Sequence, residues 1–263
     1  MESAAETRLN AIEDGRGGGA PLVFLHGFGL DAGVWSDMQS AFAGDGPTIA
    51  YDLPGHGSSH LGAGLEKTGK MAGAVTADLT RRGLGKVHLV GHSMGGAIAT
   101  LIAMRTPGLV ASMTLLAPGG YGPEINHRLL RRHARARTRD ELLAAYENMF
   151  GWNSPVPERL VDNVFARRAE PGAIEGLCTI LDTMLKPEGD DFYQGTFRRA
   201  DLAALPMPVK VLWGTQDRVL PTRQAHRLPP MFAAHVFENT GHMLIEERPD
   251  AVISLIRQNI RSA

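Results

Sequence analysis

Residues 86–105 read KVHLVGHSMGGAIATLIAMR, and the fold of the chain follows from this stretch. Its first part, 87–90, is short and apolar apart from His88, which is typical of a buried strand. From Gly96 onward it is rich in Ala with almost no polar side chains, which indicates a buried helix. Between strand and helix lies GHSMG at 91–95, a G-x-S-x-G sequence.

The spacing of this motif has a physical reason. A strand that turns directly into a helix strains the residue at the corner, and the residues two before and two after it come too close for a β-carbon. Ser93 is therefore expected to stand clear of the sheet at a helix N-terminus, where free N–H groups favour a developing anion. The alternative is a turn that contains a serine by chance, and the flanking strand and helix argue against it.

Strands and helices alternate on both sides of this motif. Apolar strands are expected at 21–25, 48–51 and 112–116, with helices from about 34 to 42 and from 68 to 82. A weaker alternating run at 8–13 predicts an edge strand. The order predicts an α/β fold with a mostly parallel central sheet and helices on both faces. Ligands of such sheets bind at the carboxyl ends of the strands, where the unusual motifs of this chain lie.

The pattern changes between residues 121 and 196. No buried strand is expected there, and helical stretches at 139–150, 157–169 and 172–185 are separated by Pro and Gly. Strands are expected again at 208–214 and 235–238, and a final helix at 249–261 begins with Pro249.

Bulk composition excludes several classes of protein. Lys plus Arg number 27 and Asp plus Glu number 28, so no nucleic-acid or membrane-surface partner bound by bulk charge is expected. The single cysteine, Cys178, excludes an internal disulfide and fits a reducing compartment. Residues 1–13 do not resemble a signal peptide, and no apolar run is long enough to span a membrane. A cytoplasmic protein is therefore expected.

The chain resembles the α/β-hydrolase superfamily. The resemblance is carried by GHSMG at 91–95, HGFG at 26–29, GTQDRVLP at 214–221 and NTGHM at 239–243. It implies an α/β-hydrolase core formed by residues 1–120 and 197–263, and a helical cap over the site formed by residues 121–196.

The resemblance also implies a catalytic triad in the order Ser, Asp, His. Ser93 would be the nucleophile, Asp217 the carboxylate that orients the base, and His242 the general base and acid. Asp182 and Asp201 are rival carboxylates, but they lie in or beside the expected cap. Asp217 could instead cap a turn, and His242 could be a surface histidine.

Other polar residues of these motifs have less direct roles. By resemblance, the backbone N–H groups of Phe28 and Met94 would form an oxyanion hole, and His26 would hold the loop that carries Phe28. Asp52, His56 and Ser59 match a loop motif of structural character. These three residues do not make a metal site, and no cofactor or metal is expected. The arginines between 128 and 139 predict a solvated helix face.

The sequence thus predicts a cofactor-free serine hydrolase that acts on a small ester, lactone or related acyl substrate. Relatives that cleave carbon–carbon bonds leave that reaction open as an alternative. Residues 208–247 also look like the acyltransferase-like component of acetoin-cleaving complexes, although the lipoyl-bearing domain of such a component is lacking here. A non-catalytic ligand-binding receptor that keeps the hydrolase pocket is the alternative from another class. The oligomeric state is left open.

Overall fold

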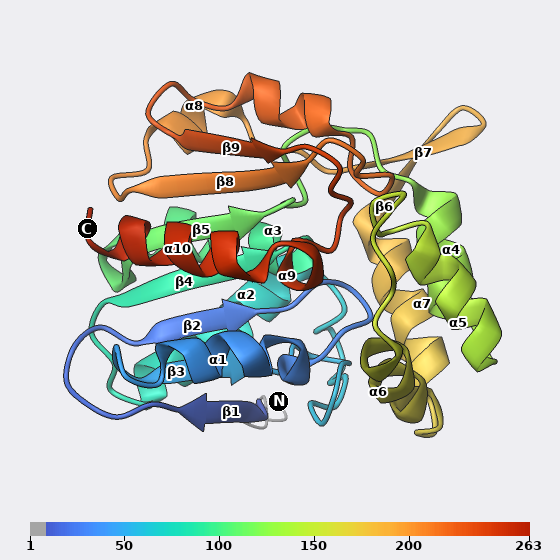
Figure 1. Cartoon of the computed structure of the whole chain (residues 1–263), viewed down its shortest axis with the longest axis horizontal. Helices are drawn as coiled ribbons and strands as arrows, with labels where there is room; N and C mark the ends of the chain where they lie inside the picture. The colour runs from blue at the N-terminus through green and yellow to red at the C-terminus, as the bar shows by residue number, and fades with distance from the viewer. Residues whose placement is uncertain (1–8) are drawn as a thin grey trace.

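The computed structural model describes residues 9–263 and places a seven-stranded sheet between helices (Figure 1). The strand order is β1-β3-β2-β4-β5-β8-β9. β1 runs antiparallel to β3, and the other neighbouring pairs are parallel. The predicted α/β fold with a mostly parallel sheet is confirmed. The strands are β1 (Ala11–Asp14), β2 (Leu22–Leu25), β3 (Thr48–Tyr51), β4 (Val87–His92), β5 (Val110–Leu116), β8 (Val209–Gly214) and β9 (Ala233–Phe237).

Helices cover both faces of this sheet. α1 (Ser36–Phe42) and α10 (Pro249–Ile260) contact each other on one face, and α2 (Thr68–Arg81) and α3 (Met94–Arg105) contact each other on the opposite face (Figure 1). Because both faces are covered, β2 and β4 are buried at every position, and β2 reads as a continuous apolar run. The shorter elements are η1 (Ala32–Trp35), η2 (Pro107–Leu109), α8 (Arg199–Ala203), η3 (Thr222–Arg227) and α9 (Leu244–Glu247). Within residues 9–263, the helices are too short or too polar to cross a membrane.

Residues 121–196, called the insertion below, lie beyond the carboxyl ends of the parallel strands (Figure 1). They contain the helices α4 (His127–Arg135), α5 (Arg139–Glu147), α6 (Glu158–Arg168) and α7 (Ala173–Met184). On α4, Arg128, Arg132 and Arg135 are exposed, as expected for a solvated face. The chain thus leaves the sheet after β5, builds a separate helical layer at the motif-bearing edge, and returns through α8 to β8.

A hairpin in the insertion was not predicted. β6 (Leu185–Glu188) pairs antiparallel with β7 (Asp191–Gln194), with only Gly189 and Asp190 between them. Pro187 inside the first strand and the exposure of β6 after Leu185 hide the strand pattern. The Gly-Asp pair is a signal for a two-residue hairpin loop, and Gly189 has the positive φ, +59°, that such loops require.

Some expected element bounds differ at the ends of the chain. The predicted edge strand at 8–13 is observed as β1 at Ala11–Asp14, and Arg8 lies outside the described residues. Residues 1–13 were expected not to form a signal peptide, and residues 1–8 of that stretch also lie outside the described residues. The predicted strand at 235–238 is observed two residues earlier, as β9.

The turn between β4 and α3 has the strained geometry that the motif predicts. Ser93 has φ 52° and ψ −114°, a conformation that a non-glycine residue rarely adopts. A β-carbon on Gly91 would lie 2.5 Å from the carbonyl oxygen of Gly95, and one on Gly95 would lie 2.1 Å from the carbonyl oxygen of Leu25. Both neighbours are backbone atoms, so neither can rotate away. The two glycines are therefore required by close contact of three chain segments.

We expect Gly95→Ala to lower the free energy of unfolding by more than the roughly 1–3 kcal/mol typical of overpacking, because the clash is with the backbone of β2. Gly73→Ala is the matched control. Gly73 is exposed in α2, and a β-carbon there would meet nothing within 4 Å. It should stabilise by up to about 1 kcal/mol through helix propensity. Urea unfolding of both variants checks this, and a Gly95→Ala protein as stable as wild type would contradict the packing account.

Candidate active site

A short polar contact joins Asp217 and His242. Oδ2 of Asp217, in the loop after β8, lies 2.7 Å from Nδ1 of His242, in the loop after β9. Oδ1 of Asp217 accepts the backbone N–H groups of Val219 and Leu220, each at 2.8 Å. Both side chains are buried. A carboxylate oxygen accepts a hydrogen bond, so this contact favours the imidazole tautomer with the proton on Nδ1, in which Nε2 has the lone pair.

The rival carboxylates of the sequence have other partners. Asp182 lies 3.1 Å from Arg131 on α4, and Asp201 pairs with Arg198, the N-cap residue of α8, with their nearest atoms 2.6 Å apart. The carboxylate beside His242 is therefore that of Asp217, and a surface position for His242 is excluded by its burial.

The loop that carries His242 is held against the turn at Ser93. Nε2 of His92, the residue before Ser93, donates to the carbonyl oxygen of His242 at 2.9 Å, and the two imidazole rings lie 4.8 Å apart. Burial and the neighbouring His242 hold the pKa of His92 well below its usual value, so its ring is neutral. The sequence did not single out His92. It ties the serine and histidine segments together, although they are far apart along the chain.

A segment of the insertion also clamps the acid and histidine loops. The backbone N–H of His242 donates to Met149 O at 2.6 Å, and Glu247 accepts the N–H groups of Gly241 at 3.0 Å and Gly151 at 2.8 Å. Arg218, next to Asp217, donates to the carbonyl oxygen of Phe150 at 2.6 Å. Residues 147–152, at the end of α5, therefore hold both loops in place, which the sequence did not predict because every contact is long-range.

Ser93 lines a cavity of about 290 Å³. Phe28 and Met94 line it too, and in residues 9–263 neither backbone N–H has a hydrogen-bond acceptor. The walls come from α3, from the loop after β5 and from the insertion. Most lining side chains are apolar, including Ala97, Leu101, Ile125, Leu130, Met184, Phe197, Val219 and Leu220. The arrangement brings a serine, two free N–H donors and a mainly apolar, partly open cavity together in one place.

The remaining motif residues hold loops. Nδ1 of His26 lies 2.7 Å from Gly27 O and therefore donates to it, while its Nε2 accepts the N–H of Leu53 at 3.0 Å. Asp52 accepts the N–H groups of Ala32 and Ser58, each at 2.7 Å. Within residues 9–263, no group of three His, Cys, Asp or Glu side chains is arranged to hold a metal ion.

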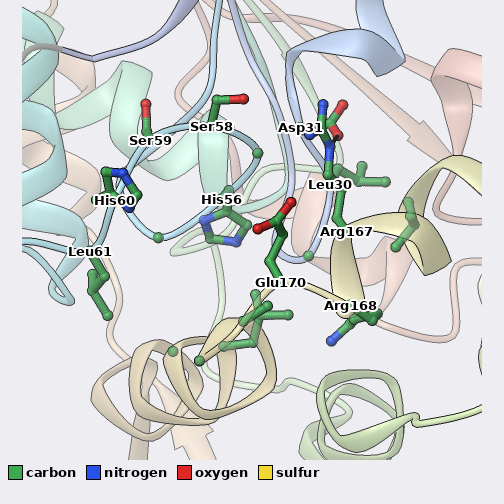
Figure 2. Close-up of a pocket in the computed structure, with 18 of the residues that line it drawn as sticks. Leu30, Asp31, His56, Ser58, Ser59, His60, Leu61, Arg167, Arg168 and Glu170 are labelled. Carbon is green, nitrogen blue, oxygen red and sulfur yellow. Dashed lines mark hydrogen bonds and ion pairs between the residues drawn. The ribbon is translucent and has the colours of Figure 1, made fainter.

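A second cavity, of about 340 Å³, lies between the loop at 55–61 and the helices α6 and α7 (Figure 2). Ser93 does not line it. Figure 2 shows Asp31 beside Arg167, an ion pair at 3.3 Å. Arg168 donates to the carbonyl oxygens of His133 and Ala134 at the end of α4, at 3.1 and 2.9 Å. These charged side chains bind loops and helix ends, so their observed role is to hold the walls of this cavity together.

Comparison with known proteins gives the family. A family model described as "Alpha/beta hydrolase family" matches residues 22–255. The chain therefore belongs to the alpha/beta hydrolase family, and the prediction of an α/β-hydrolase enzyme is confirmed.

Individual relatives carry different activities in their names. The dihydrolipoyllysine-residue acetyltransferase component of the acetoin cleaving system of Cupriavidus necator is 32% identical over 246 residues, which are 93% of this chain and 65% of that protein. This chain thus spans less than two thirds of that relative's length. The 2-hydroxy-6-oxononadienedioate/2-hydroxy-6-oxononatrienedioate hydrolase of a Pseudomonas species is 25% identical over 259 residues, 93% of this chain and 89% of that one. The structure of a meta-cleavage product hydrolase from Pseudomonas fluorescens superposes with a TM-score of 0.83 at 21% identity, over 96% of this chain and 94% of that one.

Several histidines around the site are buried and uncharged. Burial lowers the pKa of His56 to about 3 and holds that of His133 well below its usual value, with the Arg168 charge adding to the effect at both. His133 packs edge-on against Tyr146, with ring centroids 5.1 Å apart. In residues 9–263 neither of its ring nitrogens has a hydrogen-bond partner. His133 thus packs as a neutral aromatic ring and takes up a proton only when the protein unfolds.

This burial predicts a pH dependence of stability. In the unfolded chain His133 binds a proton near pH 6.5, whereas in the folded chain it stays neutral. The free energy of unfolding is therefore unaffected by His133 above about pH 6.5 and decreases as the pH falls below it. Each histidine that stays neutral in the folded chain lowers the free energy of unfolding by about 2 kcal/mol between pH 7 and pH 5. We expect His133→Phe to reduce the loss of stability over that range by about 2 kcal/mol, measured by urea unfolding.

The matched control is His60→Phe, because His60 is exposed. It should leave the pH dependence of stability unchanged. An equal pH dependence in wild type and His133→Phe would show that His133 is charged in the folded protein and would contradict its burial.

Proposed function

We propose that this α/β hydrolase cleaves a small ester, lactone or related acyl substrate through an acyl-serine intermediate. Ser93 is the nucleophile, His242 the general base and acid, and Asp217 the carboxylate that orients His242. The observation that carries the proposal is the buried 2.7 Å contact between Asp217 and His242, with Asp217 fixed by two further N–H groups. His92 ties the His242 loop to the strained strand-to-helix turn at Ser93.

The proposed reaction has two halves. Ser93 Oγ attacks the carbonyl carbon while Nε2 of His242 takes the hydroxyl proton, and the leaving alcohol then departs with that proton. In the second half, water attacks the acyl-serine ester, His242 again takes a proton, and Ser93 regains it as the acid product leaves. Asp217 stabilises the imidazolium in both halves and keeps its tautomer fixed. No step needs a cofactor or a metal.

The transition state carries negative charge on the carbonyl oxygen. We propose that the N–H groups of Phe28 and Met94 bind this oxygen, because both line the Ser93 cavity and neither has an acceptor in residues 9–263. Met94 is also the first residue of α3, where the helix dipole favours an anion. A donor of this kind is worth about 2.7–4 kcal/mol in the transition state.

We further propose that residues 121–196 form a cap that sets substrate specificity over a core of 1–120 and 197–263. Two observations support this division. The insertion lies beyond the carboxyl ends of the strands, and it supplies much of the wall of the Ser93 cavity, including Ile125, Leu130, Met184 and residues 194–196 (Figure 1). The cavity volume of about 290 Å³ suits a small molecule. The location that the sequence predicts for the protein is the cytoplasm.

Two other reactions use the same residues. Carbon–carbon bond hydrolysis is a second candidate because a relative of similar length bears the name of such a hydrolase. Acyl transfer from Ser93 to an acceptor other than water is a third, supported by the likeness to the acetyltransferase component, of which this chain spans 65%. Product analysis with p-nitrophenyl esters of graded acyl length, with and without added thiol, distinguishes hydrolysis from transfer.

Ser93→Ala should abolish ester turnover and labelling by a fluorophosphonate, since the attacking oxygen is lost, while the unfolding midpoint stays close to that of wild type. Ser40→Ala, in an exposed position of α1, is the control and should label and turn over normally. Wild-type rates in Ser93→Ala on every substrate would exclude Ser93 as nucleophile. A wild-type protein that binds ligands and never labels would instead fit a non-catalytic receptor.

Asp217→Asn should lower turnover by about 10⁴, the loss found for that change in serine proteases, because an amide supports the wrong imidazole tautomer. Asp182→Asn is the control, since Asp182 faces Arg131 instead of His242. Steady-state rates on a p-nitrophenyl ester, with circular dichroism to check folding, provide the measurement. A large loss in Asp182→Asn with near-normal turnover in Asp217→Asn would reverse the assignment.

A further inference from the structure

The Ser93 cavity contains one charged side chain. Among the described residues that line it, the polar ones are hydroxyl or amide side chains apart from Lys186. Lys186 comes from β6, the exposed strand of the hairpin in the insertion. Lys186 is itself exposed, so its ammonium group stays in contact with solvent while it also lines the cavity, where it is the one charge among the described lining residues.

Lys186 has no carboxylate of its own. Within residues 9–263, no carboxylate oxygen lies within 4 Å of its Nζ, whereas Asp191 on the partner strand pairs with His127 at 2.9 Å. Nζ of Lys186 lies close to Gly195, which also lines the cavity. A β-carbon on Gly195 would lie 3.5 Å from Nζ of Lys186. The ammonium group therefore rests against the cavity wall.

The hairpin that carries Lys186 is fixed relative to Ser93. Gln194, at the end of β7, is buried; its backbone N–H donates to Pro123 O at 2.9 Å, and its Oε1 accepts the N–H of Gly120 at 3.0 Å. The preceding residue, Gly119, donates its N–H to Ser93 O at 3.0 Å. A short chain of hydrogen bonds thus joins the base of the hairpin to the turn at Ser93. The backbone of the hairpin next to Lys186 is therefore tied to the turn that carries the serine.

We propose that Lys186 binds a carboxylate of the substrate, remote from the bond that is cleaved. The substrate class is an ester that carries one negative charge, such as the monoester of a short dicarboxylic acid. The apolar walls accommodate the carbon chain, the cavity of about 290 Å³ limits its length, and Lys186 supplies the counter-charge. This inference rests on the proposed function and adds to it the charge of the substrate.

The test compares two p-nitrophenyl esters of equal acyl length, the glutarate monoester and the neutral valerate. In Lys186→Met we expect kcat/KM for the glutarate ester to fall about tenfold, as for loss of a charge-assisted hydrogen bond, with kcat/KM for the valerate ester unchanged within about twofold. Lys186→Arg should restore most of the preference. Lys86→Met, which removes an exposed lysine that does not line the Ser93 cavity, should change neither value.

Salt dependence separates charge from shape. Raising salt from about 20 mM to about 500 mM should lower the wild-type preference for the anionic ester and leave the ratio in Lys186→Met unchanged. Equal losses on both esters would indicate a steric role for Lys186 and overturn the proposal. So would a preference for the anionic ester that persists in Lys186→Met.

A binding measurement keeps the proposal independent of turnover. Glutarate should bind to Ser93→Ala in calorimetry, and about tenfold more weakly to the Ser93→Ala, Lys186→Met double variant. If Ser93 fails to label and glutarate still binds through Lys186, the proposed hydrolysis is wrong and the anion site stands. If wild-type Ser93 labels and glutarate binds equally to both variants, the nucleophile assignment stands and the anion site at Lys186 is wrong.

Discussion

The turn from β4 into α3 is the constraint on which the rest of the structure depends. At Ser93 the chain changes direction within one residue, and this requires contacts between Gly91, Gly95 and the carbonyl of Leu25 that leave no room for a single β-carbon. Those contacts fix the spacing of β2, β4 and α3. They also place Ser93 at the carboxyl edge of a parallel sheet, where the loops after β2, β8 and β9 meet as well. The strain at Ser93 is tolerated because buried strands on both sides of β4 hold it in place.

The position of the histidine depends on more than the sheet. His242 is held at its side chain by Asp217, at its carbonyl by His92 and at its N–H by Met149. The last of these belongs to the insertion, as does the segment that Arg218 and Glu247 bind. The insertion therefore does two things: it forms part of the cavity wall and it helps to fix the imidazole. A change in the packing of α5 would therefore affect the position of His242 as well as the wall of the cavity.

The fold alone does not choose the reaction. The relatives and structural neighbours include proteins named as an acetyltransferase component, a meta-cleavage product hydrolase and a methyl ester esterase. What differs between such proteins is the charge and shape of the space next to the serine. Here that space is apolar, small and marked by one lysine, while the arginines of α4 lie on an exposed face and pair with surface carboxylates or remain in solvent. This distribution of charge is the basis of the proposal that the substrate is small and negatively charged.

The sequence by itself determined the sheet, the turn and the order of the motif residues. Strands such as Leu22–Leu25 and Thr48–Tyr51 are short, apolar and bounded by Gly or Pro, so local pattern is enough to find them. The contact between Asp217 and His242 was also expected, because the segments at 214–221 and 239–243 resemble the acid and histidine motifs of the family and each follows a strand at the same edge of the sheet. The sequence could not give the hairpin at 185–194, the clamp by residues 147–152, the contact of His92 with His242, or the place of Lys186 in the cavity. Each of these depends on backbone groups or side chains that are distant along the chain, and only the packing of the insertion against the sheet brings them together.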